Sequence, residues 1–262
     1  SIFISDKFLF NSDLVTSDQA SVIFNHYSYD SSFLESNDVS LVLNVNDKKI
    51  SLMAEYLDEE NYYLPYYKTY TSVENVDWDI INEDLFFYNK NTLDIAPSFF
   101  PQEDLFSNWS VTSNSANIDL KKKQLKLNDV DELQISDAFI LPRNGEVEIG
   151  ENFSISKLYD SEIILDTINE YHRFINASVD INSKDQFIGS GIYEYVNFNN
   201  DTFNIPFSEF KLVETFDENE QKIKTSFSSG VVDKESPILM EPGFNFFGNI
   251  ELFANNAQLL FN

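Results

Sequence analysis

The sequence predicts an all-β protein, an elongated stack of antiparallel strands and hairpins with a solenoid-like or jelly-roll-like body. The chain has 25 Phe and 13 Tyr but only 7 Gly, and aromatic residues favour pleated, half-buried surfaces. Apolar and polar residues alternate along most of the 262 positions, which is the period of a strand with one buried face. Short polar segments interrupt this alternation, as the turns of hairpins do. A closed sandwich is the alternative arrangement of the same strands.

The clearest hairpin lies in residues 39–54. Apolar side chains alternate over 39–45 and again over 50–54, and the polar segment 46–49 separates the two runs. A second hairpin of the same form joins 118–120 to 125–127 through three lysines. Both match the pattern of two period-two runs around a short polar turn.

A third hairpin is predicted across residues 142–145, because Asn144-Gly145 adopts positive φ at little cost and apolar Val147 and Ile149 follow. Further strands are predicted where apolar residues alternate at 177–181, 192–195 and 203–207. Template matching of this kind gives about fifteen short strands in all.

The domain prediction is one continuous β-rich unit over 1–262, with a candidate seam near 97–115 between an N-terminal unit (1–96) and a C-terminal unit (116–262). The seam is placed there because Pro97, Pro101 and a polar Ser/Asn cluster around Trp109 weaken the strand pattern. Residues 6–25 are the one stretch long enough for a helix, and short helical turns are expected in 14–36 and 160–170. The apolar final residues, 259–261, suggest a piece of a longer chain.

Composition excludes several functions. The net charge is −27, from 44 acidic and 17 basic residues, and such a field repels nucleic acid and anionic lipid. The absence of cysteine excludes disulfides and zinc thiolates. No stretch approaches the roughly 20 apolar residues of a membrane helix. We therefore expect no nucleic-acid partner and no transmembrane segment in this chain.

No residue pattern predicts a catalytic site, so the chain is not expected to be an enzyme. The two histidines, His26 and His172, are far apart in sequence, and Gly189-Ser190-Gly191 lacks the context of a nucleophile elbow or phosphate loop. No metal or cofactor site is predicted, because the acidic clusters at 58–60, 129–132 and 217–220 do not match an EF-hand loop. Adventitious calcium binding by these clusters stays open.

Aromatic residues supply the one candidate binding surface. Aromatic rings stack on sugars and anchor protein interfaces. The alternative is simple alternation across a strand, with half of the rings in the core and half on its rim. The candidate residues are Tyr62, Tyr63, Tyr66, Tyr67, Tyr70, Trp78 and Trp109.

The second half of the chain carries a distinctive series of strand and turn segments. These segments are 119–122, 135–142, 166–167, 170–172, 175–179, 189–196, 205–207 and 242–254. The series resembles a segment of very large β-rich proteins of Bacteroidetes bacteria, over about residues 116–262. The first 115 residues match only through 66–69 and Trp78. The resemblance implies an exported envelope protein of the periplasm or cell surface, and it implies no catalytic residue.

Three functions are consistent with these observations. The first is a non-enzymatic structural or interaction module of a bacterial cell-envelope or surface assembly, whose partners are other envelope proteins or other segments of the same long chain. The second is a carbohydrate-binding or adhesin module, which would use the aromatic residues. The third is a lipid-handling β groove that bridges membranes, in which the many Phe residues would line an open trough.

Overall fold

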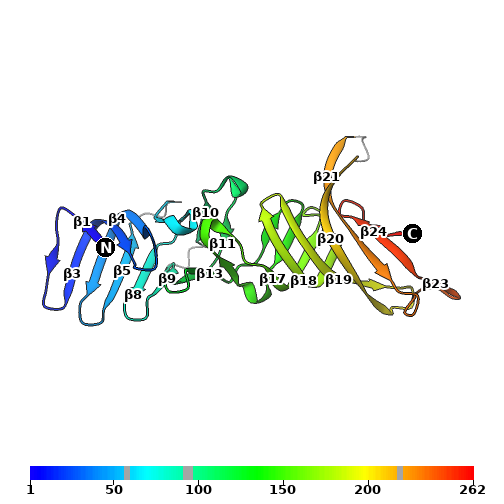
Figure 1. The fold of residues 1–262 in the computed structure, drawn as a ribbon, viewed down its shortest axis with the longest axis horizontal. Coiled ribbons are helices and arrows are strands. Elements are labelled where there is room, and N and C mark those ends of the chain that lie inside the picture. The colour runs from blue at the N-terminus through cyan, green and yellow to red at the C-terminus, as the bar shows by residue number, and fades with distance from the viewer. Residues whose placement is uncertain (56–59, 91–96, 217–220) are drawn as a thin grey trace. The chain divides into compact units, whose positions relative to one another are not determined.

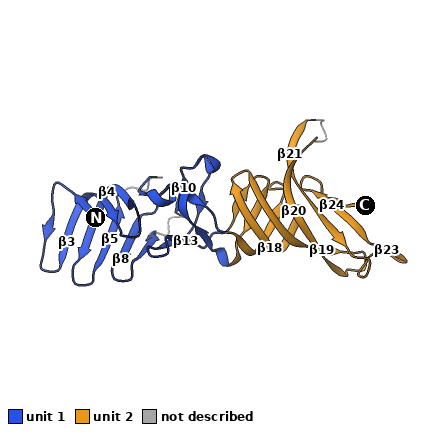
Figure 2. Cartoon of the chain, viewed as in Figure 1, with its two compact units in different colours: residues 1–131, 144–156 blue, residues 132–143, 157–262 orange. Residues whose placement is uncertain are grey.

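The computed structural model describes residues 1–55, 60–90, 97–216 and 221–262, and it confirms the all-β prediction. Every strand pair in these ranges is antiparallel, and the only helical segments described are short 3-10 turns. The chain forms two compact units, residues 1–131 with 144–156 (unit 1) and residues 132–143 with 157–262 (unit 2), coloured separately in Figure 2. The four 3-10 turns are η1 (Pro65–Tyr67), η2 (Asp104–Phe106), η3 (Arg143–Gly145) and η4 (Glu151–Phe153).

Unit 1 is a single sheet of fourteen described strands that branches at β4 (Figure 1). One branch runs β4-β5-β8-β9-β12-β13-β16, the other runs β4-β6-β7-β10-β11, and β3 joins β1 and β2 to β4. Successive hairpins therefore alternate between the branches. The strands are β1 (Ile2–Ile4), β2 (Leu9–Phe10), β3 (Leu14–Asn25), β4 (Ser32–Asn44), β5 (Lys49–Ala54), β6 (Tyr62–Leu64), β7 (Thr69–Thr71), β8 (Asn75–Asp79), β9 (Asp84–Tyr88), β10 (Ser98–Pro101), β11 (Val111–Thr112), β12 (Ser115–Asp119), β13 (Gln124–Asn128) and β16 (Val147–Ile149).

The core of unit 1 is built from rows of apolar residues that lie directly opposite one another on neighbouring strands. Because side chains alternate between faces, each strand buries every second residue. Fully buried rows of this kind stabilise a sheet through cross-strand packing. One row contains Leu41, Leu52, Val76, Phe87, Ala116, Leu127 and Val147, and the next contains Ile50, Trp78, Leu85, Ile118, Leu125 and Ile149.

Three hairpin turns of unit 1 are built in the same way. Each begins with Asn44, Asp79 or Asp119, whose Oδ1 accepts hydrogen bonds of 3.0–3.1 Å from the backbone N–H groups two and three residues later. This Asx-turn geometry satisfies backbone donors at the end of the hairpin. The fifth residue of each turn has positive φ, namely 55° at Lys48, 64° at Glu83 and 53° at Lys123.

Unit 2 is a sheet of nine described strands that curls into a half-barrel, with a separate two-stranded hairpin. The ring of Phe174 packs inside it, with its centroid 5.4 Å from that of Phe207 and 4.8 Å from that of Phe210. The sheet runs β14 (Leu133–Ile135), β15 (Ala138–Leu141), β17 (Leu158–Leu165), β18 (His172–Ser183), β19 (Gln186–Val196), β20 (Thr202–Phe216), β21 (Lys222–Val232), β24 (Gly248–Phe253) and β25 (Leu260–Phe261), and the hairpin is β22 (Ile238–Glu241) with β23 (Phe244–Phe246).

The hairpins predicted at 39–54 and 118–127 are confirmed as β4–β5 and β12–β13. The hairpin predicted across 142–145 is wrong. Asn144 and Gly145 do have positive φ, but β15 before them pairs with β17 of unit 2, and β16 after them pairs with β13 of unit 1. The turn therefore joins two sheets instead of two neighbouring strands.

Two other expectations also differ from the structure. Strands β10 and β11, with η2 between them, lie within unit 1, so the candidate seam at 97–115 is not where the units divide. Residues 6–25 contain strand β3 and no helix. The stretches 14–36 and 160–170, in which helical turns were expected, belong mainly to strands β3, β4 and β17. The alternation that buries Ala20, Val22 and Phe24 has period two, which overrides helix propensity.

Candidate functional site

The structure does not bring the predicted aromatic residues together as one surface. Tyr62, Tyr67 and Trp78 are buried in the core of unit 1. Trp78 packs between Phe24 and Phe33, with ring centroids at 5.0 and 5.3 Å. Burial raises the pKa of Tyr62 and of Tyr67, so both phenols stay neutral. These three residues stabilise the fold and do not form a binding surface.

Two further members of the predicted set pack in separate places. The Trp109 ring lies against Phe106 and Phe153, with centroids 5.3 and 6.2 Å away. Tyr66 meets Tyr29 edge to face at 5.1 Å. The Nζ of Lys123 lies 5.4 Å from the centre of the Tyr66 ring and 5.3 Å from that of Tyr29. Tyr66 therefore belongs to an intramolecular cation–π contact.

The remaining two, Tyr63 and Tyr70, form a half-exposed aromatic strip with Phe100. The ladder places Tyr63 opposite Tyr70 and Tyr70 opposite Phe100 on strands β6, β7 and β10, so the three side chains share one face. The rings of Tyr63 and Tyr70 lie 4.6 Å apart at 32°. The residues on either side of each ring are buried, which makes the strip the outer face of this branch.

Polar groups border the aromatic strip. Glu35 of β4 lies opposite Tyr63 in the ladder and accepts a hydrogen bond from the Ser32 hydroxyl. An ion pair of 2.5 Å joins Lys68, which lies between η1 and β7, to Glu103, which follows β10. Burial raises the pKa of Tyr63, and the neighbouring Tyr70 and Glu35 raise it further. The strip thus combines an apolar ring surface with carboxylates and an ammonium group.

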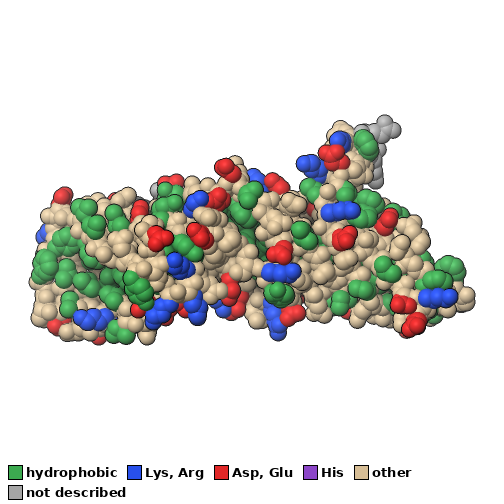
Figure 3. Space-filling model, viewed as in Figure 1, with side chains coloured by type: hydrophobic (Ala, Val, Ile, Leu, Met, Phe, Trp, Pro, Cys, Tyr) green, Lys and Arg blue, Asp and Glu red, His purple; other side chains and the backbone are tan. Residues whose placement is uncertain are grey.

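A second surface feature is the edge of unit 1 formed by β1 and β2. Both strands pair with β3, and no other described strand pairs with them. Their large apolar side chains are exposed, in contrast to the buried rows of the inner strands. The exposed fractions are 51% for Ile2, 62% for Ile4, 53% for Leu9 and 77% for Phe10. In Figure 3 hydrophobic side chains gather at the end of unit 1 that carries these strands.

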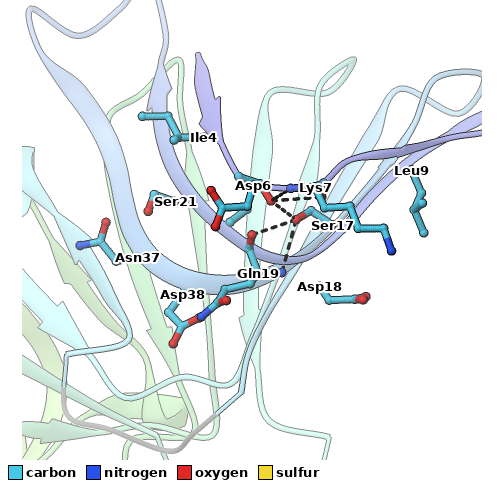
Figure 4. A pocket seen from close by; sticks show the side chains of 12 residues that line it. Ile4, Asp6, Lys7, Leu9, Ser17, Asp18, Gln19, Ser21, Asn37 and Asp38 are labelled. Atoms are coloured by element: carbon cyan, nitrogen blue, oxygen red, sulfur yellow. Dashed lines mark hydrogen bonds between the residues drawn. The ribbon is translucent and has the colours of Figure 1, made fainter.

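An arch interrupts this edge between β1 and β2. Residues 5–8 leave the ladder, and the Ser5 hydroxyl lies 2.8 Å from that of Ser17 on β3. A cavity of about 640 Å³ surrounds the arch, and its wall includes three carboxylates and one lysine. Figure 4 shows Asp6 and Lys7 on the arch itself, with Asp18 of β3 and Asp38 of β4 near it. The edge of unit 1 is therefore apolar on its strands and acidic at its centre.

The two histidines lie in different surroundings, one in each unit. His26 lies 3.2 Å from the Glu83 carboxylate. His172 is buried, and its Nε2 lies 2.6 Å from the carbonyl oxygen of Asn256, so this nitrogen carries the proton and donates it. The described part of the chain contains no group of three or more His, Asp or Glu side chains placed to hold a metal ion. Of the acidic clusters considered for calcium, 217–220 and most of 58–60 lie outside the described residues.

No helix in the described ranges has the length and apolar character that crossing a membrane requires. Comparison of the chain with protein-family models, with curated proteins and with solved structures finds no match. The fold alone defines the class of this chain, which is an all-β protein with two compact units of antiparallel strands. The resemblance to Bacteroidetes envelope proteins stays a prediction.

Sequence reasoning missed Phe100 and the open edge. Phe100 follows the buried Phe99 at a strand position, so alternation alone places it on the outer face. The sequence does not reveal that β10 pairs with β7. The register that places Phe100 opposite Tyr70 is set only when the chain folds. The exposure of Ile2, Ile4 and Phe10 likewise depends on their lying on the edge of the sheet.

Proposed function

We propose that this chain is a non-enzymatic structural and interaction module of a bacterial cell-envelope or surface assembly, exported to the periplasm or cell surface. The observation that supports a role in binding a partner is the apolar edge formed by β1 and β2. An edge strand presents unpaired backbone N–H and C=O groups, and natural sheets usually protect such edges with charges, prolines or short strands. Here the two edge strands are short and the arch between them carries Asp6 and Lys7, yet the strands themselves expose the apolar side chains of Ile2, Ile4, Leu9 and Phe10.

The mechanism is addition of a partner strand to this edge. Backbone hydrogen bonds supply affinity in strand addition, and alternate side chains supply specificity. The exposed apolar residues provide area to bury, at about 25 cal/mol per Å² before the costs of association. The net charge of −27 and the carboxylates at the arch favour a strand that carries Lys or Arg. Such a strand comes from another envelope protein or from another segment of the same polypeptide.

The envelope location rests on the resemblance over residues 116–262. A lipid-handling groove has less support, because in unit 2 the rings of Phe174, Phe207 and Phe210 occupy the interior that an acyl chain would need. We therefore favour shape and strand pairing over lipid transfer.

A photo-crosslinking amino acid placed at Phe10 in cells of the source organism tests this function. The expected result is one defined crosslinked envelope protein, or an internal crosslink to the same polypeptide, recovered from the membrane or periplasmic fraction. Ile4→Lys, which puts a charge on the same edge, should abolish that crosslink. A probe at Tyr159, 64% exposed in unit 2, is the control. Crosslinks that are equally diffuse from both positions, or recovery in the cytoplasm, would contradict the proposal.

A further inference from the structure

We propose that the strand which adds to the β1–β2 edge is β21 of a second copy of this chain, through residues 222–224. This inference rests on the proposed function, because it names the partner of the same edge. In Figure 1 the hairpin of β20 and β21 extends beyond the rest of its sheet. The end of this hairpin is therefore open to another molecule without any change in the sheet of unit 2.

Residues 222–224 form a short open edge of β21. On one side they pair with β20. On the other side β24 pairs with β21 only from Phe227 to Val232, so no described strand pairs with 222–224 there. β1 is also three residues long and pairs only with β3 in the described ranges. Antiparallel pairing of these two edges gives both of them the backbone partners that an edge strand lacks.

The alternation of side chains on β21 matches that on β1. Ile2 and Ile4 are exposed, whereas Phe3 between them lies opposite the buried Val22. On β21, positions 222 and 224 are exposed lysines, and Ile223 between them is half-buried. Residues that lie opposite one another share a face. Pairing of Ile223 with Phe3 therefore puts both apolar side chains on the inner face and the two lysines beside the exposed isoleucines.

The charges around Ile4 favour a lysine at this position. Ile4 lines the arch cavity together with Asp6, Asp18, Asp38 and Lys7, so three carboxylates face one ammonium group. A lysine opposite Ile4 covers the isoleucine with its hydrocarbon stem and brings its ammonium group to the cavity. The added strand then supplies the positive charge that complements the acidic arch.

The same hairpin is where this chain carries lysines on open strand edges. Among edges that no described strand pairs, lysines occur only on β20 and β21, at Lys211, Lys222 and Lys224. Two copies that each carry −27 repel one another as wholes. A contact between them therefore requires opposite charges where they meet, and the pairing of β21 with the arch supplies them.

The existing contacts of the hairpin do not oppose this pairing. Lys222 forms an ion pair of 2.5 Å with Glu214 of β20, and their side chains are 61% and 54% exposed. Such an exposed pair contributes little to stability, so its exchange for another carboxylate costs little. The charge match is confined to β21, since the acidic segment 217–220 lies outside the described residues.

This contact joins copies head to tail. The open edge belongs to unit 1 and the hairpin to unit 2, so the two surfaces differ. A copy whose edge is filled still offers its own hairpin to the next copy. Contacts between unlike surfaces build rings or open chains of copies instead of closed two-fold dimers.

Sedimentation velocity of the whole chain tests the second copy as partner, over about 1–500 μM, a range that covers weak protein contacts. We expect the sedimentation coefficient to rise with concentration. Lys224→Glu and Ile4→Lys should each weaken this association at least about tenfold, because each puts like charge where the proposal needs attraction or apolar contact. Lys234→Glu makes the same change of charge at another exposed position of unit 2 and should leave the association unchanged.

Mixing the two weakened variants tests the head-to-tail geometry. The Ile4→Lys chain keeps its hairpin and the Lys224→Glu chain keeps its edge, so the mixture should form a one-to-one complex that neither variant forms alone. Far-ultraviolet circular dichroism checks that each variant is folded. A wild-type chain that stays monomeric throughout, or self-association that survives Lys224→Glu, would overturn the second copy as partner. The crosslink from Phe10 in cells reports separately on the edge: a crosslink there to a different protein, with a monomeric chain here, would keep the proposed function and reject this inference.

Discussion

The backbone N–H of Ile80 donates to the carbonyl oxygen of Lys48 at 3.0 Å, and this bond joins the turn of hairpin β8–β9 to the turn of hairpin β4–β5. Leu120, in the turn of hairpin β12–β13, makes the same 3.0 Å bond to Glu83 in the turn of hairpin β8–β9. In both pairs the donor is the second residue of its turn and the acceptor is the positive-φ fifth residue of the preceding one. The turns of three hairpins in unit 1 are therefore hydrogen-bonded to one another, in addition to the hydrogen bonds between the strands.

The Asx turns should contribute measurably to stability. Asn44→Ala removes the acceptor of the N–H groups of Asn46 and Asp47, so we expect the free energy of unfolding to fall by about 1 kcal/mol. Asn46→Ala truncates an exposed side chain of the same turn and keeps the acceptor, so it should cost much less. Urea denaturation followed by circular dichroism measures both. Equal losses in the two variants would show that the Asx bonds contribute nothing.

Trp78 should behave as a core residue. Trp78→Ala leaves a cavity beside Phe24 and Phe33, and we expect a loss of about 3–5 kcal/mol in the free energy of unfolding. Trp78→Phe should cost clearly less, because it keeps a ring and removes an indole N–H that is buried without a partner in the described structure. Chemical denaturation ranks the two variants. A Trp78→Ala chain as stable as wild type would place the indole outside the core.

Gly230 permits close packing in the half-barrel of unit 2. A Cβ there would lie 2.9 Å from the ring of Phe207 and 2.9 Å from the carbonyl oxygen of Pro206. Gly230→Ala should therefore destabilise the chain by about 1–3 kcal/mol through overpacking. Ser229→Ala, one position earlier, adds no atom and is the matched control. Thermal unfolding of the two variants separates overpacking from a general effect of substitution on this strand.

His172 should make stability depend on pH in the weakly acidic range. Burial lowers the pKa of His172 below its ordinary value of 6.5, against the opposing effects of the Asn256 carbonyl and Asp166. As pH falls below about 6.5, the unfolded chain therefore takes up this proton before the folded chain does, and the free energy of unfolding decreases. The glutamine variant His172→Gln keeps a donor but does not titrate. Denaturation of both proteins between pH 7.5 and about 5 should show a smaller decrease in the variant, and parallel curves would contradict this origin.

Local patterning in the sequence was sufficient for the strands but not for their partners. Alternation correctly placed the hairpins at 39–54 and 118–127, because each pairs with its immediate neighbour. It failed at 142–145, where Asn144-Gly145 supplies a turn whose two flanking strands belong to different sheets. Pairing between distant strands depends on how much apolar surface the whole fold buries, and a short stretch of sequence carries no information about that.

The same limit explains the aromatic residues. Tyr62 and Tyr63 are adjacent and chemically alike, yet one is buried and the other half-exposed. Period-two alternation separates them into two faces, but which face becomes the core is decided by the register of β6 against β4 and β7. The repeat of the turns at Asn44, Asp79 and Asp119 was detectable in principle, since each starts with an Asx residue at a strand end. Their spacings of 35 and 40 residues are unequal, which hides the repeat.

Hydrogen–deuterium exchange of the β1 amides, residues Ile2–Ile4, tests the central claim most directly. It compares the isolated chain with the same chain isolated under mild conditions in its native envelope assembly. Strand addition predicts that the outward-facing amides of β1 and β2 exchange quickly in the isolated chain and become protected in the assembly. The amides of β7, which is paired with β6 and β10, should not change. Equal exchange of β1 in both states would show that this edge takes no partner strand and would contradict the proposed function.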